Sequence, residues 1–178
     1  MGAFAKVSAA VFEPTTDPVL VGKADIEALK SEAQASPTGR ARLLLHSHRD
    51  DALHEMIIAL PSHSCDHPHI NFKSGKSFLA LSGQFAVMVF SDDGSEMVPF
   101  ILSAEDAFPG AKMVRLSAAA WHTIIPLAGD VVFLESIIGP FEGNRFAPWF
   151  PGADKPAEER EAWVNKLRKA ARKTALDG

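Results

Sequence analysis

The sequence contains a single cysteine, Cys65, among 178 residues. One cysteine excludes a disulfide within the chain, and residues 1–6 lack the long apolar run of a signal peptide, so we expect a protein of the reducing cytoplasm. No stretch reaches the roughly 18 consecutive apolar residues of a membrane-spanning helix. Even residues 131–141 are interrupted by Glu135 and Pro140, and we therefore expect no membrane partner.

Positive charge is also scarce over most of the chain. The formal net charge is −4, and no cluster of Lys and Arg precedes the C-terminal segment, so we expect no nucleic-acid partner. A composition of 47% hydrophobic and 22% charged residues is typical of a globular protein rather than a disordered one. The length suits one domain, and because no repeat or linker interrupts it we predict a single domain over residues 1–178.

The first 39 residues predict an arm made of a strand and a helix. Residues 7–12 form one short β-like run, and residues 13–18 are rich in turn formers. Apolar side chains then recur at helical spacing over residues 24–34, which indicates a short amphipathic helix that ends at the Ser-Pro-Thr-Gly stretch 36–39.

From residue 40 to residue 141 the pattern changes to short strand-like runs separated by Gly, Pro, Asp and Ser. These runs are residues 41–46, 53–60, 76–81, 84–90, 97–102, 112–116, 122–127 and 130–138. Eight strands predict an all-β fold, either a jelly roll or a small barrel. Asp93-Gly94 predicts a hairpin turn. Runs such as 85–90 are apolar on both faces, so we expect the barrel interior on one side and a sheet, helix or subunit on the other.

Residues 142–178 predict a loop followed by a helix. The loop, residues 142–151, carries much aromatic surface and must pack on something. The helix starts near Pro156, with Glu158 and Glu159 at the positive end of its dipole. The Lys and Arg residues of this helix are more simply interpreted as a solvent-exposed helix face than as a binding patch. We expect a homodimer from the doubly apolar strands and from the aromatic loop.

Two histidines, His67 and His69, predict a metal site. Residues two apart in an extended strand share a face, so both imidazoles can reach one ion. A third ligand must come from elsewhere, and His122, at the head of an apolar strand, is the best candidate. A His-x-His pair alone is a weak signal, and its support comes from the strand context and the spacing to His122.

These motifs resemble those of a known superfamily. Asp66-His67-Pro68-His69, then residues 78–83, then Trp121-His122-Thr123 look like the two cupin motifs, and a longer similarity over about residues 29–149 resembles the WbuC-type cupin-fold metalloproteins. The resemblance implies a cupin jelly-roll barrel, with its core at about residues 40–141 and a metal inside. It also implies a link with bacterial polysaccharide biosynthesis.

The chain departs from the cupin pattern at Lys76. Cupins usually carry a glutamate seven residues before the motif glycine, and counting back from Gly83 this position holds Lys76. An ammonium beside a divalent ion is repelled by several kcal/mol, roughly twice the ~3 kcal/mol of two unit charges 5 Å apart at a dielectric of about 20. Lys76 must therefore turn away, lose its proton or pair with a carboxylate. Glu135 is the expected partner, because a lone carboxylate in an apolar strand is costly to bury, and Glu55 is the second choice.

The remaining histidines are weaker candidates. His54 shares a strand face with Met56 and Ile58, so it either lines the cavity or is a satisfied rim histidine. His63 and Cys65 alternate with the predicted ligands, but Pro68 argues for irregular backbone there. His46 and His48 are expected in loops.

Three functions fit these observations. The first is a metal-dependent enzyme acting on a small polar molecule such as a sugar or sugar acid, with Zn²⁺, Fe²⁺, Ni²⁺ or Mn²⁺ held by the three histidines. The second is a metal-free isomerase or epimerase that uses a cavity histidine and Lys76. The third is a small-ligand-binding module without catalysis. The candidate catalytic residues are Lys76, His54 and Glu135. Because the motif glutamate is missing, the metal-dependent function is less favoured than it would otherwise be, and the other two functions are more favoured.

Overall fold

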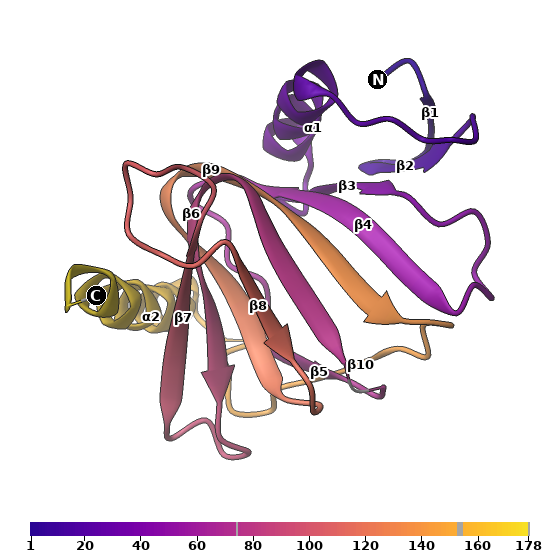
Figure 1. Ribbon diagram of the computed structural model, residues 1–178. Coiled ribbons are helices and arrows are strands. Elements are labelled where there is room, and N and C mark those ends of the chain that lie inside the picture. The colour runs from indigo at the N-terminus through magenta and orange to yellow at the C-terminus, as the bar shows by residue number, and fades with distance from the viewer. Residues whose placement is uncertain (74, 153–154, 178) are drawn as a thin grey trace.

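The computed structural model describes residues 1–73, 75–152 and 155–177. The strands are β1 (Phe4–Ser8), β2 (Val11–Pro14), β3 (Ala41–Leu44), β4 (Leu53–Leu60), β5 (His69–Asn71), β6 (Lys76–Phe90), β7 (Met97–Ser103), β8 (Met113–Leu116), β9 (Trp121–Ile138) and β10 (Asn144–Phe146). The helices are α1 (Lys23–Ala35) and α2 (Ala157–Asp177). The predicted all-β fold with a helix near each end is confirmed (Figure 1). Neither of the described helices is long and apolar enough to cross a membrane.

Two long strands, β6 and β9, organise the fold. They pair antiparallel along most of their length, from Lys76 opposite Ile137 to Phe90 opposite Trp121. The prediction of two strands in each of these regions is wrong, because Gly83 and its neighbours produce a register shift inside β6 rather than a strand end. Gly83 has a φ of +76°, which glycine adopts without strain, so the chain bends there and continues.

The bend lets β6 and β9 run through both halves of one continuous ten-stranded sheet, and these halves, which we call the first and second sheets, face each other. The first sheet contains β1 to β4, the second half of β9, the first half of β6, and β8. The second contains β10, β5, the first half of β9, the second half of β6, and β7. Between them lie apolar side chains such as Phe78, Phe85 and Phe133, which are 0–2% exposed. This arrangement is a jelly roll whose sheet does not close on itself.

The N-terminal arm covers the outer face of the first sheet. The predicted single run over residues 7–12 is wrong, because Ser8 ends β1 and Val11 begins β2, and the two strands form a hairpin. Helix α1 then packs Leu29 and Ala33 into the same cluster as Leu43 and Ile57 of the sheet. The outward apolar side chains of β3 and β4 are therefore covered by the arm.

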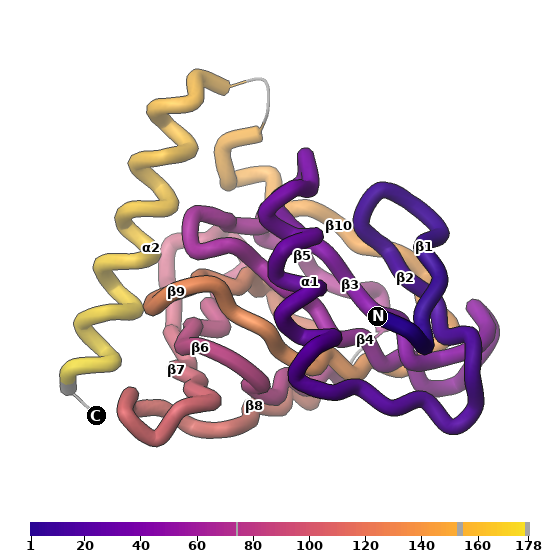
Figure 2. The backbone as a smooth tube through the Cα atoms, turned by 90° about the horizontal axis from the view of Figure 1, so that it is seen from above, coloured from indigo at the N-terminus to yellow at the C-terminus, as the bar shows by residue number. Residues whose placement is uncertain are grey.

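Helix α2 covers the outer face of the second sheet and runs along one side of the molecule, away from α1 (Figure 2). Its Val164, Leu167 and Ala171 are buried in one cluster with Met88 and Ile125. The expectation that doubly apolar strands are covered on both sides is confirmed, and within this chain the two helices provide the cover.

The aromatic loop packs against the same helix. Trp149 stacks on Trp163 with ring centroids 5.7 Å apart and also contacts Phe90 at 5.0 Å. Its ring lies directly over Gly94 in the predicted β6–β7 turn, which leaves no room for a Cβ there. Trp149 and Phe150 are thus covered within the chain, whereas Phe146 of the same loop is 59% exposed, and the homodimer stays a prediction.

Candidate functional site

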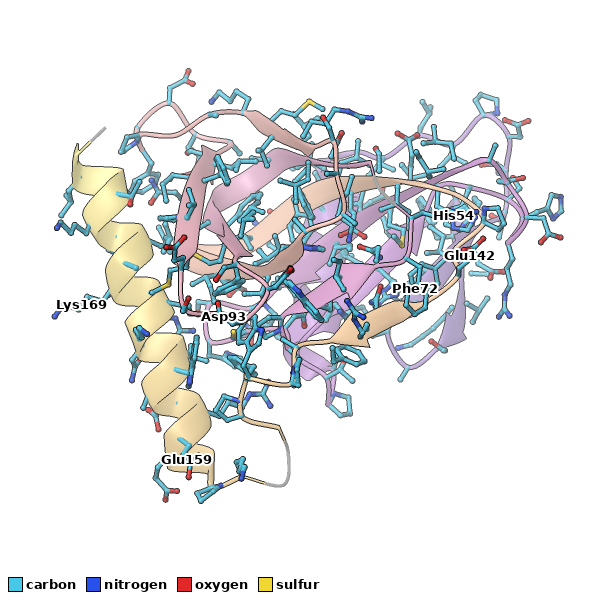
Figure 3. All side chains as sticks on the ribbon, turned by 90° about the horizontal axis from the view of Figure 1, so that it is seen from below. His54, Phe72, Asp93, Glu142, Glu159 and Lys169 are labelled. Carbon is cyan, nitrogen blue, oxygen red and sulfur yellow. The ribbon has the colours of Figure 1, made fainter. Side chains whose placement is uncertain are left out.

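The inner faces of the two sheets enclose a cavity of ≈ 640 Å³. This volume is within the range of pockets that hold small molecules. All six residues selected from the sequence line it, namely His54, His67, His69, Lys76, His122 and Glu135. His54 marks one end of the molecule in Figure 3, opposite the side formed by α2 with Glu159 and Lys169.

Strand register explains how three of these residues reach one face. On β9, Ile137 lies between His54 of β4 and Lys76 of β6. Glu135 is two residues before Ile137 on the same strand and therefore shares its face. The alternation of the first sheet thus places His54, Glu135 and Lys76 toward the interior.

Lys76 is buried, with 6% of its surface exposed, and it has two polar partners. Its Nζ lies 3.4 Å from Oε2 of Glu135, which confirms the predicted pairing. Glu55, the second choice, accepts a hydrogen bond from Ser136 Oγ instead. The other partner of Lys76, Nε2 of His122 at 3.1 Å, was not anticipated from the sequence. The ammonium has thus neither turned away nor been left unpaired.

The hydrogen bonds of His122 fix its tautomer. Its Nδ1 lies 2.8 Å from the carbonyl oxygen of Ala120, and a carbonyl only accepts, so Nδ1 carries the hydrogen. Nε2 is then the acceptor for the Lys76 ammonium. Burial above all, and then the charges of Lys76 and His69, lower the pKa of His122 well below its ordinary value. His122 is therefore neutral near pH 7.

His69 lies beside His122 in the second sheet. The two residues are paired across β5 and β9, and their ring centroids are 4.5 Å apart. Nδ1 of His69 donates to the carbonyl of His67 at 3.1 Å, which leaves the lone pair on Nε2. In the described part of the chain this Nε2 has no hydrogen-bond partner, and no buried side-chain nitrogen or oxygen there is unsatisfied, so it opens to the cavity. Burial first, and then Lys76, lower the pKa of His69.

His67 is held differently from His69. It precedes β5, which begins at His69, so the two do not share one regular strand as expected. Its Nε2 donates to the carbonyl of Ala147 at 2.9 Å, and its ring packs against Phe146 and Phe150. The imidazole lines the same cavity but is anchored to the loop that follows β10.

The cavity carries a surplus of positive charge that the sequence reasoning missed. Arg40, Arg42, Arg49 and Lys76 line it against only two carboxylates, Asp66 and Glu135, in a chain whose net charge is −4. Arg40 pairs with Asp66 at 2.8 Å, as Lys76 does with Glu135. The available signal was the alternation in β3, where Arg42 occupies an inward position between Ala41 and Leu43.

Comparison with known proteins identifies the fold. Residues 21–102 match a family model described as "Domain of unknown function (DUF6016)", and no curated protein matches the sequence. An oxalate oxidase in complex with the substrate analogue glycolate superposes with a TM-score of 0.50 at 13% identity, over 81% of this chain and 76% of that chain. The capsular polysaccharide assembling protein CapF from Staphylococcus aureus superposes with a TM-score of 0.51 at 14% identity, over 62% of this chain and 32% of that chain. Both are cupin-fold proteins. This chain has the cupin fold.

In this cupin fold the predicted metal ligands share a cavity without forming a cluster. Among residues 1–73, 75–152 and 155–177, no group of three or more His, Cys, Asp or Glu side chains is arranged to hold a metal ion. The Lys76 ammonium is hydrogen-bonded to Nε2 of His122, which is the atom that would bind the ion. A metal cation could bind there only if the Lys76 side chain moved away from that nitrogen. The metal set of His67, His69 and His122 stays a prediction.

The other sequence candidates lie at the cavity rim or away from it. His54 donates from Nε2 to the carbonyl of Arg49 at 3.0 Å and stacks on His46 at 4.0 Å between centroids. His46 is a loop residue as expected, yet it lines the cavity. Burial first, and then the charge of Asp66, raise the pKa of the Cys65 thiol to about 12, so this thiol is not a nucleophile at neutral pH.

Proposed function

We propose that this cupin binds a small polar carbonyl compound, such as a sugar or sugar acid, and moves a proton on it without a metal, as an isomerase or epimerase does. The observation that carries the proposal is the buried Lys76 ammonium at the cavity wall, paired with Glu135 and hydrogen-bonded to neutral His122. A fixed cation in a water-poor site favours negative charge that develops on a bound substrate.

Lys76 has the role of stabilising that charge. When a proton leaves the carbon next to a carbonyl, the electron pair of the broken C–H bond moves toward the carbonyl oxygen. The ammonium of Lys76 donates a hydrogen bond to this oxygen or protonates it. Glu135 and His122 act as positioning residues, since each holds the ammonium through one contact.

His69 has the role of the base. Its Nδ1 hydrogen is fixed by the carbonyl of His67, so the lone pair on Nε2 faces the cavity close to the Lys76–His122 pair. Nε2 takes the proton from carbon and, once the intermediate has turned in the cavity, returns it to the other face of that carbon. Alternatively it returns the proton to the neighbouring carbon, while Lys76 protonates the carbonyl oxygen and its amine then takes the proton of the neighbouring hydroxyl. The first outcome is epimerisation and the second is isomerisation, and neither needs an oxidant or a reductant.

Deuterium exchange tests this function directly. The protein is incubated in D₂O with a panel of aldoses, ketoses and hexuronates, and deuterium at the carbon next to the carbonyl is followed by NMR. We expect exchange with at least one compound, unchanged by a chelator, and a loss of about 100-fold in Lys76→Met and in His69→Gln, as for removal of a general acid or base. His63→Gln is the matched control, because His63 is not among the residues that line the cavity.

Three results count against the proposal. Exchange that stops with a chelator would indicate a metal-dependent reaction. Exchange that survives Lys76→Met would remove the role given to the ammonium. Binding of a panel compound, seen as a rise in melting temperature, without any exchange would leave the chain as a binding module.

A metal-dependent reaction is the second candidate, because the rings of His69 and His122 lie 4.5 Å apart in the same cavity as His67. A bound Zn²⁺, Fe²⁺, Ni²⁺ or Mn²⁺ would supply Lewis acidity toward a carbonyl. Lys76→Glu would replace the ammonium by a carboxylate ligand, and it should tighten Zn²⁺ or Mn²⁺ binding in calorimetry at least tenfold. His122→Ala in the same background should reverse the gain. An affinity unchanged by Lys76→Glu would argue that residue 76 does not face the metal position.

A further inference from the structure

Arg42 is a cavity residue that the proposed reaction does not use. It lies on β3, where its neighbours Ala41 and Leu43 are 1% and 0% exposed and pack toward α1. The alternation of the strand directs Arg42 and Leu44 to the opposite face, and both line the cavity. A guanidinium is thus presented to the interior of the fold by a regular strand rather than by a loop.

The guanidinium of Arg42 has no protein partner in the ranges that the structure describes. Arg40 pairs there with Asp66 and Lys76 with Glu135, but no hydrogen bond or ion pair involves the side chain of Arg42. No buried side-chain nitrogen is left unsatisfied in the same ranges, so the Arg42 nitrogens reach the open space of the cavity. A half-buried guanidinium with free donors is an arrangement that an oxyanion completes.

The charges around Arg42 point to the same class of ligand. The two carboxylates of the cavity are each engaged by another cation, Asp66 by Arg40 and Glu135 by Lys76. The uncompensated positive charge therefore belongs to Arg42 and to Arg49, which is exposed. A planar guanidinium binds a carboxylate through two parallel hydrogen bonds, which a lysine cannot copy.

We propose that Arg42 binds the carboxylate of the ligand, so that the molecule held in this cavity is a sugar acid or a similar hydroxy acid rather than a neutral sugar. This inference rests on the proposed binding of a small polar molecule and names its class. It does not depend on the proton transfer. A phosphate ester presents a related oxyanion, so the experiment includes one.

Calorimetry with three probes tests the inference. D-Glucuronate, D-glucose and D-glucose 6-phosphate are titrated into the wild-type chain and into Arg42→Met, Arg42→Lys and Arg115→Met. We expect wild type to bind glucuronate at least tenfold more tightly than glucose. Arg42→Met should lose that preference, and Arg42→Lys should keep only part of it because the two-point contact is gone. Arg115→Met removes the same charge outside the cavity lining and should bind as wild type does.

The outcomes separate this inference from the proposed function. Equal affinity of wild type for glucose and glucuronate overturns the role of Arg42 and leaves the proposed function standing, and this arm needs no variant. Undiminished glucuronate binding by Arg42→Met overturns it too. Binding of glucose 6-phosphate without glucuronate overturns the choice of a carboxylate. Binding of glucuronate through Arg42 without any deuterium exchange supports the inference while the proposed reaction fails. Absence of binding by all three probes overturns the inference, and the deuterium-exchange panel decides the proposed function separately.

Discussion

Two cations of the first sheet face the same cavity in contrasting ways. Lys76, on β6, is 6% exposed and has both an ion-pair partner and a hydrogen-bond partner. Arg42, on β3, is half-buried and has neither in the described part of the chain. A charge removed from water must be paired within the protein, whereas one that keeps some solvent can be left with free donors. Stability is therefore expected to depend on keeping Lys76 paired, whereas Arg42 is free to recognise the carboxylate of the ligand.

The largest effect is expected from breaking the buried pair. Glu135→Ala leaves the Lys76 ammonium without its counter-charge, and loss of one member of a buried pair costs about 3–5 kcal/mol. Urea unfolding at pH 7.5 would measure the loss in the free energy of unfolding. Lys76 keeps its contact with His122, which favours the lower end of that range.

A double variant provides the control for this prediction. Lys76→Met with Glu135→Leu removes both charges and fills the space with apolar atoms, so it should recover most of the stability that Glu135→Ala loses. A loss below about 1 kcal/mol in Glu135→Ala alone would mean that the pair is screened as a surface pair is, and the contrast with Arg42 would disappear.

This pairing shows what the sequence could predict about the site. A lone glutamate inside the apolar run of β9 and a lysine in the place of a motif glutamate each require compensation, so charge alone predicted that Lys76 meets Glu135. The contact between Lys76 and His122 could not be predicted. The two residues lie at opposite ends of the β6–β9 ladder, opposite Ile137 and Val89, and meet only across the cavity, with a tautomer set by the carbonyl of Ala120. Arg42 was overlooked since a single arginine in a strand is more often exposed.

The fold shows a similar division between what was and was not predictable. Alternation and turn residues located most strands and both helices, with ends within a few residues. Gly83 and Gly129 suggested strand ends, but a positive φ also allows a strand to bend and continue, and only tertiary pairing decides between the two. Ala9 and Ala10 carry no turn signal, so the β1–β2 hairpin was read as one run.

Acidification should lower the free energy of unfolding by a smaller amount than the loss of the buried pair does. The pKa values of His69 and His122 lie below the ordinary value of 6.5, so below pH 6.5 the unfolded chain binds protons that the folded chain does not. The free energy of unfolding is therefore highest above pH 6.5 and falls as the pH decreases, by at most about 1.4 kcal/mol per pH unit for each histidine. We expect a loss of about 2 kcal/mol between pH 7.5 and 5.5 in urea unfolding.

A non-titrating variant sharpens that measurement. His122→Gln keeps an oxygen that accepts from Lys76 but cannot take up a proton, and it should reduce the slope by the contribution of one histidine. The aspartates with lowered pKa, such as Asp93, titrate below their ordinary value of 3.8 and do not contribute in this range. A stability that stays level from pH 7.5 to 5.5 would show that the two imidazoles are not shielded from water.

The smallest effect is expected at Arg42. Without ligand, Arg42→Met removes a half-buried cation that contributes no protein contact in the described ranges, so the free energy of unfolding should change by less than about 1 kcal/mol, with a gain more expected than a loss. The comparison is made in urea beside Glu135→Ala. A loss near 3 kcal/mol in Arg42→Met would mean that the guanidinium stabilises the fold, and the two cations would then differ only in their partners. A neutral result together with lost glucuronate binding separates the two roles, because the Arg42 guanidinium would then contribute to ligand binding and not to the stability of the empty cavity.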